Sequence, residues 1–417
     1  MSDQPNIAAM VKVFGRIGIL SFGGPAAQIA LMHREVVENN NWLSERQFLN
    51  GLSFCTLLPG PEAMQLATYA GWRLHGTLGG LIAGLLFVLP GAAIVLALAA
   101  AYAIWGQASY ATGLFLGVKA AVLVIVIEAL LKVSRKALKL WDHWLVAALA
   151  FVGLFFFAAP YPLIVLAAAI WGALRGAESE PAAPVTVRPM RTIGTIALWA
   201  LIWAAPFGLL ALTGGPLLTD VAAFFSKLAA VTFGGAYAVL AYMAQDVVQG
   251  FGWLTAGEML DGLGLAETTP GPLILVTEFV GFLAGYKEGG MALGIAAAAI
   301  VLWVTFAPCF LWIFAGAPYI EWISAQRRLS GALSGVTAAV VGVILNLSVW
   351  FGLHVLFAEV TAERAGPLIL WTPDVGTLDW RVVALTSVSA VLMLRLKWGV
   401  APVLAIMAVA GLGLSTI

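Results

Sequence analysis

The chain has 417 residues, of which 62% are hydrophobic and 10% are charged, and its formal net charge is zero. This composition excludes an ordinary soluble protein and indicates a polytopic membrane protein. Because neither basic nor acidic residues are in excess, the sequence predicts no nucleic-acid partner, and the lipid bilayer is the expected surrounding.

The N-terminal segment begins polar and shows no cleavable signal pattern, so we expect insertion to rely on internal apolar segments. Segments long enough to cross a hydrocarbon core of about 30 Å lie at residues 78–104, 113–131 and 193–212. They are continuous rather than alternating, which favours helices over a β-barrel. The predicted fold is therefore all-α and polytopic, with about 10 to 13 membrane segments, some of them broken or re-entrant.

The first apolar segment is interrupted by SFGGP at residues 21–25, and PGP follows at residues 59–61. Paired glycines permit the backbone to unwind, and a proline suits the first turn of a new helix. The N–H groups at the start of such a half-helix, with its dipole, can bind an anion. Kinking or close helix packing is the alternative role for these residues.

Both breaks occur a second time, 211 residues later. SFGGP recurs as TFGGA at residues 232–236, and PGP recurs at 270–272. Such a recurrence indicates an internal duplication. Breaks at equivalent places in two halves are typical of transporter binding sites, so we favour anion binding over packing alone.

Four segments are predicted along the chain. The first repeat covers residues 1–174, a polar cytoplasmic linker 175–191, an extra spanning helix 192–213 and the second repeat 214–417. The linker is rich in Pro, Ala and charged residues that cannot bury a helix. The single extra helix would invert the second repeat relative to the first.

Basic residues support that inversion. Four of them cluster at residues 132–139, whereas the corresponding loop of the second half, residues 354–379, carries only Arg364. Two further loop pairs reverse in the same way. The positive-inside rule therefore predicts inverted-topology repeats in a bacterial inner membrane, with a cytoplasmic N-terminus and a periplasmic C-terminus.

Charged residues near the breaks are candidates for function. Arg16 lies five residues before Ser21 and Lys227 lies five residues before Thr232, where a cation would help to hold an oxyanion. Snorkelling to the membrane surface is the alternative. Glu62 and Glu267 flank the two PGP motifs and are predicted to couple transport to protons, with a structural ion pair as the alternative. Other acids within apolar sequence are Glu128, Asp246 and Glu278.

Polar residues beside the breaks complete the predicted anion site. Besides Arg16 and Lys227, it includes the hydroxyl residues Ser21, Thr232, Thr268 and Thr269. No catalytic, metal-binding or nucleotide-binding motif is found, so the sequence predicts no catalytic residue, no metal and no cofactor.

Three sequence blocks resemble the chromate ion transporter family in its long, two-domain form. They are SFGGP, LLPGPEAMQLATYAGW at residues 57–72 and AETTPGPLILVTEFVGF at 266–282, and the likeness covers both halves. It implies export of chromate, with sulfate as a similar oxyanion, driven by the proton-motive force. The motif positions that carry over are Phe22, Gly23, Gly24, Pro25, Pro59, Gly60, Pro61, Gln65, Phe233, Gly234, Gly235, Pro270, Gly271 and Pro272.

Ala236 stands where the first half has Pro25, which suggests that the two half-sites are not equivalent. An anion channel would need the same site without a coupling acid, and a membrane-embedded enzyme would need a polar catalytic cluster that the sequence does not show. The preference between chromate and sulfate and the formation of a homodimer stay open at this point.

Overall fold

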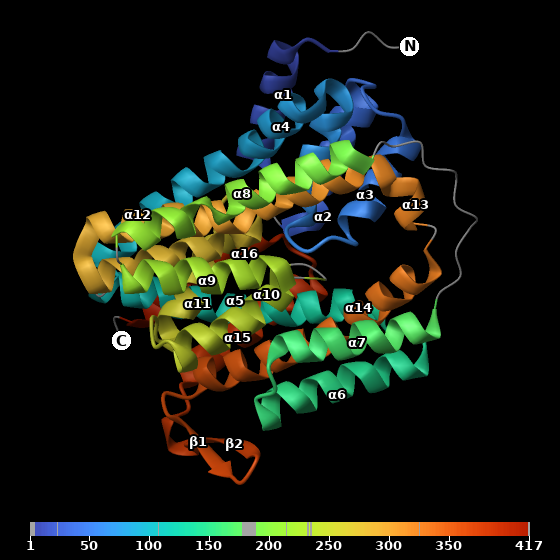
Figure 1. Ribbon diagram of the computed structural model, residues 1–417. Helices are drawn as coiled ribbons and strands as arrows, with labels where there is room; N and C mark the ends of the chain where they lie inside the picture. Colours follow the sequence, from blue (N-terminus) through green and yellow to red (C-terminus); the bar gives the residue numbers. More distant parts are fainter. Residues whose placement is uncertain are drawn as a thin grey trace. The chain divides into compact units, whose positions relative to one another are not determined.

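The computed structural model describes residues 5–22, 24–106, 108–176, 189–213, 215–231, 233, 236–324 and 326–415. These residues are almost entirely helical, with one two-stranded sheet (Figure 1). Among them, five helical stretches are long and apolar enough to cross a membrane. The predicted all-α polytopic fold is therefore confirmed. The five stretches are Glu62–Trp105, Tyr110–Ala137, Met190–Leu212, Leu273–Tyr319 and Arg327–Leu356.

The chain forms two compact units that do not follow the order of the sequence. The first unit comprises Met1–Ala100, Ala177–Ala236 and Thr269–Ser330. The second comprises Ala101–Gly176, Tyr237–Thr268 and Gly331–Ile417. Each unit thus takes segments from both predicted repeats.

The order of elements recurs in the two halves. Each half opens with a helix, a short helix, a π-helix and a further helix, and a residue with positive φ follows each π-helix, Asn41 at 53° and Gly252 at 66°. In the first half these elements are α1 (Ile7–Leu20), α2 (Gly24–His33), η1 (Arg34–Asn39) and α3 (Glu45–Cys55). In the second half they are α9 (Pro216–Val231), α10 (Ala236–Gln245), η2 (Asp246–Gly250) and α11 (Ala256–Thr268).

A helical hairpin follows in each half. Helix α4 (Glu62–Trp105) leaves helical geometry at His75 and Gly76, and α12 (Val276–Gly316), preceded by the short turn η3 (Leu273–Leu275), does so at Gly289 and Gly290. The chain turns back sharply, because a methyl group on Gly71 would lie 2.2 Å from the carbonyl oxygen of Gly79. Each short arm is below the ~20 residues that a spanning helix needs, so each is a half-helix that starts directly after PGP.

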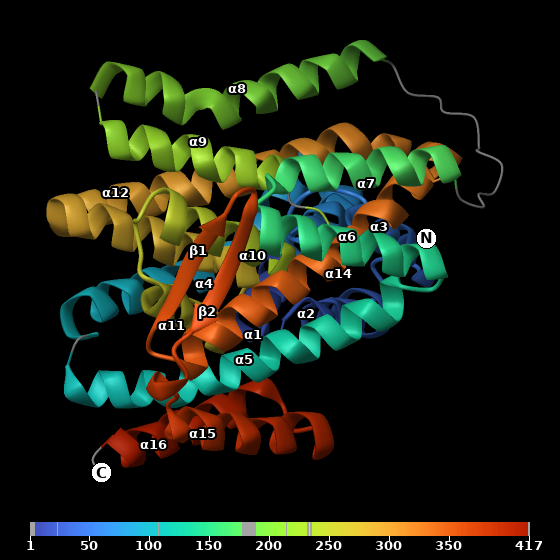
Figure 2. The ribbon, with the colours of Figure 1, turned by 90° about the horizontal axis from the view of Figure 1, so that it is seen from below.

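The first unit packs its helices through small residues. Helix α8 (Pro189–Thr213), the extra helix, runs beside α9 and α12 (Figures 1 and 2). Gly18 brings α1 against the long arm of α4, where an added methyl would lie 2.0 Å from the carbonyl oxygen of Leu86. Next to α12 are η4 (Ala317–Tyr319) and α13 (Ile320–Ser324), and the ring of Phe54 from α3 covers Gly316.

The second unit contains the remaining long helices. These are α5 (Ser109–Ala137), α6 (Trp141–Phe157), α7 (Tyr161–Arg175), α14 (Arg327–Leu356), α15 (Trp380–Ala390), η6 (Val391–Arg395) and α16 (Val400–Ser415). Helices α15 and α16 lie along α5 (Figure 2). Glycines make these approaches possible, since methyl groups on Gly117 and Gly335 would meet the carbonyl oxygens of Met407 and Ala168.

Residues 354–379, which the sequence indicated only as a loop, contain a β-hairpin. Strands β1 (Val360–Ala365) and β2 (Leu368–Pro373) pair antiparallel, with Val360 opposite Pro373 and Ala365 opposite Leu368. The two-residue connection includes Gly366 at φ 64°, a conformation that glycine adopts without steric cost. The short turn η5 (Val375–Thr377) follows.

Candidate functional site

The end of the first helix and the second PGP motif meet within the first unit. The backbone N–H of Gly271 donates a hydrogen bond to the carbonyl oxygen of Ser21 at 2.9 Å. Ser21 is fully buried, and its hydroxyl donates to the carbonyl oxygen of Ile17 at 2.6 Å. The structure therefore joins a break of the first repeat to a break of the second.

Gln28 on α2 ties these two segments together. Its amide nitrogen donates to the carbonyl oxygen of Gly271 at 2.7 Å and to that of Ser21 at 3.2 Å. The side chain is 1% exposed, so both bonds are shielded from water. Sequence reasoning missed Gln28, since the second-half position 211 residues later is Val239 and the repeat gave no signal.

The long arm of α4 also approaches the second PGP motif. A methyl group on Gly91 would lie 2.3 Å from the carbonyl oxygen of Pro270, and Gly271 has φ 93°. Glycine is favoured at both positions. A side chain at Gly91 would block the approach of the two backbones, and Gly271 adopts a conformation with positive φ that other residues rarely adopt. Pro270 and Pro272 are also buried, so the whole motif lies inside the unit.

The first PGP motif has a different local anchor. The amide nitrogen of Gln65 donates to the carbonyl oxygen of Pro59 at 2.7 Å, and Gly60 has φ 114°. Helix α4 starts directly after Pro61, so its first turn points N–H groups without intrahelical acceptors at this motif. Pro59, Gly60 and Pro61 are buried beside Cys309, whose sulfur would lie 2.9 Å from a methyl group on Gly60.

The other predicted anion-site residues of the first unit lie apart from this junction or at its margin. Arg16 is exposed over 65% of its side chain and lies 3.7 Å from Glu35, so its nearest partner is an acid. Lys227 is exposed on α9, and Phe22 is 44% exposed. Gly24, Pro25 and Phe233 are half-buried, whereas Thr269 is buried. Gly23, Thr232, Gly234 and Gly235 lie outside the described residues.

The two predicted coupling acids differ in their surroundings. Glu267 on α11, in the second unit, is 6% exposed and accepts a hydrogen bond from the Tyr237 hydroxyl at 2.8 Å. Glu62 is half-buried in the first turn of α4, in the first unit. Next to Glu267, Thr268 is exposed, and its hydroxyl donates to the carbonyl oxygen of Leu265 at 2.7 Å, the helix-backbone bond that such residues commonly make.

An ion pair between a half-buried lysine and a buried aspartate in the second unit was not predicted. The ammonium group of Lys119 on α5 lies 3.2 Å from Oδ1 of Asp261 on α11, and the Tyr102 hydroxyl donates to Oδ2 at 2.7 Å. Asp261 is 5% exposed. Glu128, one of the acids that the sequence places within an apolar segment, pairs instead with Lys132 at 2.6 Å.

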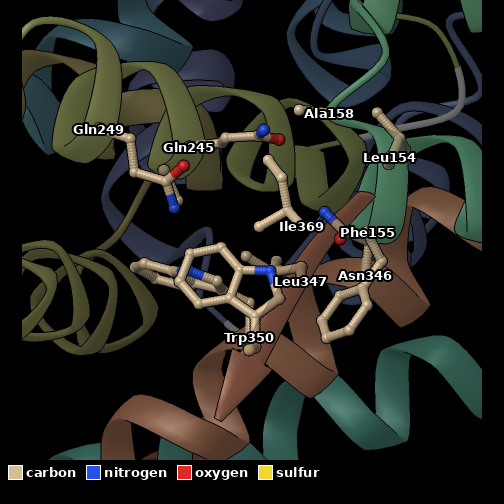
Figure 3. A pocket seen from close by; sticks show the side chains of 11 residues that line it. Leu154, Phe155, Ala158, Gln245, Gln249, Asn346, Leu347, Trp350 and Ile369 are labelled. Atoms are coloured by element: carbon tan, nitrogen blue, oxygen red, sulfur yellow. The ribbon is translucent and has the colours of Figure 1, made fainter. Parts of the chain in front are cut away.

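The second unit also contains a small pocket with a few polar side chains among mostly apolar ones. Figure 3 shows Gln245 and Gln249 on one side of it and Asn346 and Trp350 on the other. The cavity measures about 20 Å³, close to the space that one water molecule requires. Among the described residues, no acceptor lies within bonding distance of the Trp350 ring nitrogen. We therefore interpret the pocket as a water site rather than a place for an oxyanion.

Broken helices at the meeting point of two repeated halves, in a chain with several spanning helices, define an integral membrane transport protein of the repeat-built class. The chain belongs to the chromate transporter family. The family model, described as chromate transporter, matches residues 8–173 and 219–414. The two matched regions fall in the two halves that the sequence repeat predicted.

Individual relatives agree with this membership. The chromate transport protein of Pseudomonas aeruginosa is 34% identical over 362 residues, which are 85% of this chain and 82% of that protein. The probable chromate transport protein of Synechococcus elongatus is 32% identical over 352 residues, covering 83% and 85% of the two chains. No solved structure matches the chain.

A shorter relative matches only part of the chain. The uncharacterized transporter YwrB of Bacillus subtilis is 33% identical over 145 residues, which are 71% of that protein but 35% of this chain. That relative is therefore about half as long as the protein described here, as a single repeat would be.

Proposed function

We propose that this protein exports chromate across the bacterial inner membrane as a secondary active transporter driven by the proton-motive force. The observation that carries the proposal is the junction at which Gly271 bonds to Ser21. It supports the proposal because it brings a break from each half to one buried place beside half-helix starts. The names of the relatives support chromate as the substrate.

The chemistry of the junction suits a tetrahedral dianion. The helix start after Pro272 at the junction, and the one after Pro61 at the first PGP motif, present N–H groups and the positive ends of helix dipoles, which favour anions where little water competes. The junction is closed by the Gln28 amide in this structure, so we propose that the bonds of Gln28 open when substrate enters. Arg16 and Lys227 would attract the anion from the aqueous side.

Glu267 is the proposed proton carrier. A carboxylate near a dianion repels it, whereas a neutral carboxyl group does not, so protonation and anion movement are coupled through charge. Its buried place beside the Tyr237 hydroxyl supports this role, because the proton would be shielded from the bulk solvent. Glu62, at the start of α4, is the second candidate.

The orientation of the repeats is part of the proposal. The reversed distribution of basic residues supports inverted repeats, with the N-terminus in the cytoplasm and the C-terminus in the periplasm. In this arrangement the two halves can open alternately to either side.

Uptake of labelled chromate into everted membrane vesicles tests the proposal. Energised vesicles with the protein should accumulate chromate, a protonophore should abolish the accumulation, and excess sulfate should compete if the site accepts both anions. Glu267→Gln should stop uphill accumulation. Glu363→Gln, a matched change on the exposed face of the β-hairpin, should leave it intact.

Two results would contradict the proposal. Flux that persists in Glu267→Gln but follows only the chromate gradient would indicate an anion channel. Equal chromate content in vesicles with and without the protein would exclude chromate export.

A further inference from the structure

We propose that Lys119 is an anion-binding residue of the second unit and that Asp261 is the internal counter-ion which the transported oxyanion displaces from it. The inference rests on the proposed function, because it adds a further binding position for the same class of substrate. It depends on the geometry around Lys119 and not on the helix breaks.

An ion pair inside apolar helices needs a reason. Lys119 follows the start of α5 at Ser109 by ten residues, or about 15 Å along the helix, which places its ammonium well within a spanning segment. Asp261 is buried and Lys119 is half-buried. Removing charges from water costs free energy that their attraction often does not recover, and apolar residues of similar size commonly stabilise a fold as well. Ionisable residues at such places are therefore functional candidates.

The two charges do not recur in the repeat. The positions equivalent to Lys119 and Asp261 in the other half are Thr337 in α14 and Asn50 in α3, both neutral. Each of these helices therefore forms without the charge that its counterpart carries. This difference between the halves is what a site used for binding would show.

The ammonium group lies beside the start of α11. A methyl group on Gly257, in the first turn of α11, would lie 3.4 Å from Nζ of Lys119, so the lysine sits over the positive end of this helix. The missing side chain at Gly257 leaves space beside the ammonium. Close packing of α11 on α5, at Gly264 and Val118, fixes the two elements against each other.

Few other charges face the pair. Glu258 lies one turn before Asp261, and its carboxylate accepts bonds from the N–H and the hydroxyl of Thr255 at 2.7 and 3.1 Å. Helix α16, which also packs against α11 and α5, has no ionisable side chain in its sequence. Lys119 is thus the cation of this cluster, and an incoming oxyanion competes with Asp261 for it.

Tyr102 makes the displacement possible. Its hydroxyl holds Oδ2 of Asp261 while Lys119 contacts Oδ1. When an oxyanion occupies the space beside Gly257, Asp261 can release the ammonium and keep the bond from Tyr102. The carboxylate then drives the anion onward, because it returns to Lys119 as the anion leaves.

The test measures binding of labelled chromate, and separately of sulfate, to the purified full-length protein in detergent. Asp261→Asn removes the internal competitor, so the dissociation constant should fall about tenfold or more, which is the effect of one lost charge interaction of ordinary size. Adding Lys119→Gln to that variant should cancel the gain. A purely structural pair predicts the opposite sign, since breaking it would weaken the site.

Gly257→Ala provides a variant that should fold at least as well as the wild type. The methyl makes an ordinary contact with Lys119 and alanine favours the helix, so thermal stability should hold or rise while anion binding weakens several-fold. Asp379→Asn, at an exposed ion pair with Arg381, is the matched control and should leave binding unchanged.

The outcomes separate the two proposals. Unchanged or weaker binding of both anions in Asp261→Asn, or unchanged binding in Gly257→Ala, would overturn the role of Lys119. Tighter sulfate binding in Asp261→Asn, in a protein that neither binds nor transports chromate, would support Lys119 and contradict chromate export.

Discussion

Gln28 is a single side chain that holds two segments distant in sequence. Its amide bonds to Ser21 and Gly271 join the two halves at the proposed substrate site. Its own carbonyl oxygen has no bonding partner among the described residues. Such an unsatisfied buried group is costly, so the closed junction carries an energetic cost that the proposed opening of the Gln28 bonds would relieve.

Replacing Gln28 by leucine tests this residue. Gln28→Leu removes both hydrogen bonds that the amide donates, so the carbonyl oxygens of Ser21 and Gly271 each lose a donor. We expect the free energy of unfolding to fall by about 1–3 kcal/mol. Chromate uptake should fall further than this loss explains. Thermal unfolding and vesicle uptake measure the two effects, and Gln326→Leu, whose amide donates to the carbonyl oxygen of Trp322 four residues earlier, should change neither.

At the scale of elements, the long arm of α4 is shaped to fit the second PGP motif. Gly91→Ala places a methyl 2.3 Å from the carbonyl oxygen of Pro270, which must shift the motif or the helix. We expect a loss of about 1–3 kcal/mol in stability and a strong loss of transport. Gly15→Ala in α1, where no other element among the described residues comes within 4 Å of the added methyl, should instead stabilise the protein. Equal behaviour of the two alanine variants would contradict this account.

Helix α15 begins at a charged cap that lies outside the spanning segments. Asp379 accepts the N–H of Arg381 at 2.9 Å, and the bonds from the Arg381 side chain hold the pKa of this carboxyl below its usual range. A lowered pKa means that the cap is complete at neutral pH and is lost as the pH falls through that lowered value. Hydrogen exchange in the first turn of α15 should therefore be insensitive to pH, after correction for intrinsic rates, until strongly acidic conditions.

Asp379→Ala should mimic the acid state at neutral pH. Loss of an aspartate N-cap costs about 1 kcal/mol, so exchange in the first turn of α15 should be about fivefold faster. Exchange in α5 should stay unchanged in the same sample. Normal protection at the start of α15 in this variant would show that packing alone holds the helix end.

The sequence predicted the elements better than the contacts among them. The duplicated breaks and the half-helices after PGP follow from local composition, because glycine and proline set backbone geometry wherever they occur. Neither the bond of Gln28 to Gly271 nor the pairing of Lys119 with Asp261 could be predicted, since each depends on packing between distant segments. The β-hairpin was missed because its short strands lie within a segment that was assigned as a connection between helices.

At the scale of the whole molecule, the orientation of the repeats is open to direct measurement. Cys55 and Cys309 are both buried, so a cysteine-free background is obtained by replacing them. In this cysteine-free background, Pro367→Cys in the hairpin should react with a membrane-impermeant maleimide on intact cells. Lys136→Cys should react only in everted vesicles. Labelling of both positions from the same side would exclude inverted repeats.

The interleaving of segments from both halves has a consequence for how the protein is made. Ser21 emerges early in synthesis, but its partner Gly271 follows roughly 250 residues later, which takes about 10–50 s at usual rates of translation. During this interval the Ser21 carbonyl lacks its bond from the N–H of Gly271, and the first unit lacks its third segment. The nascent chain must therefore stay protected at the insertion machinery until most of the second half has been translated, and a truncated product would be a substrate for membrane proteases.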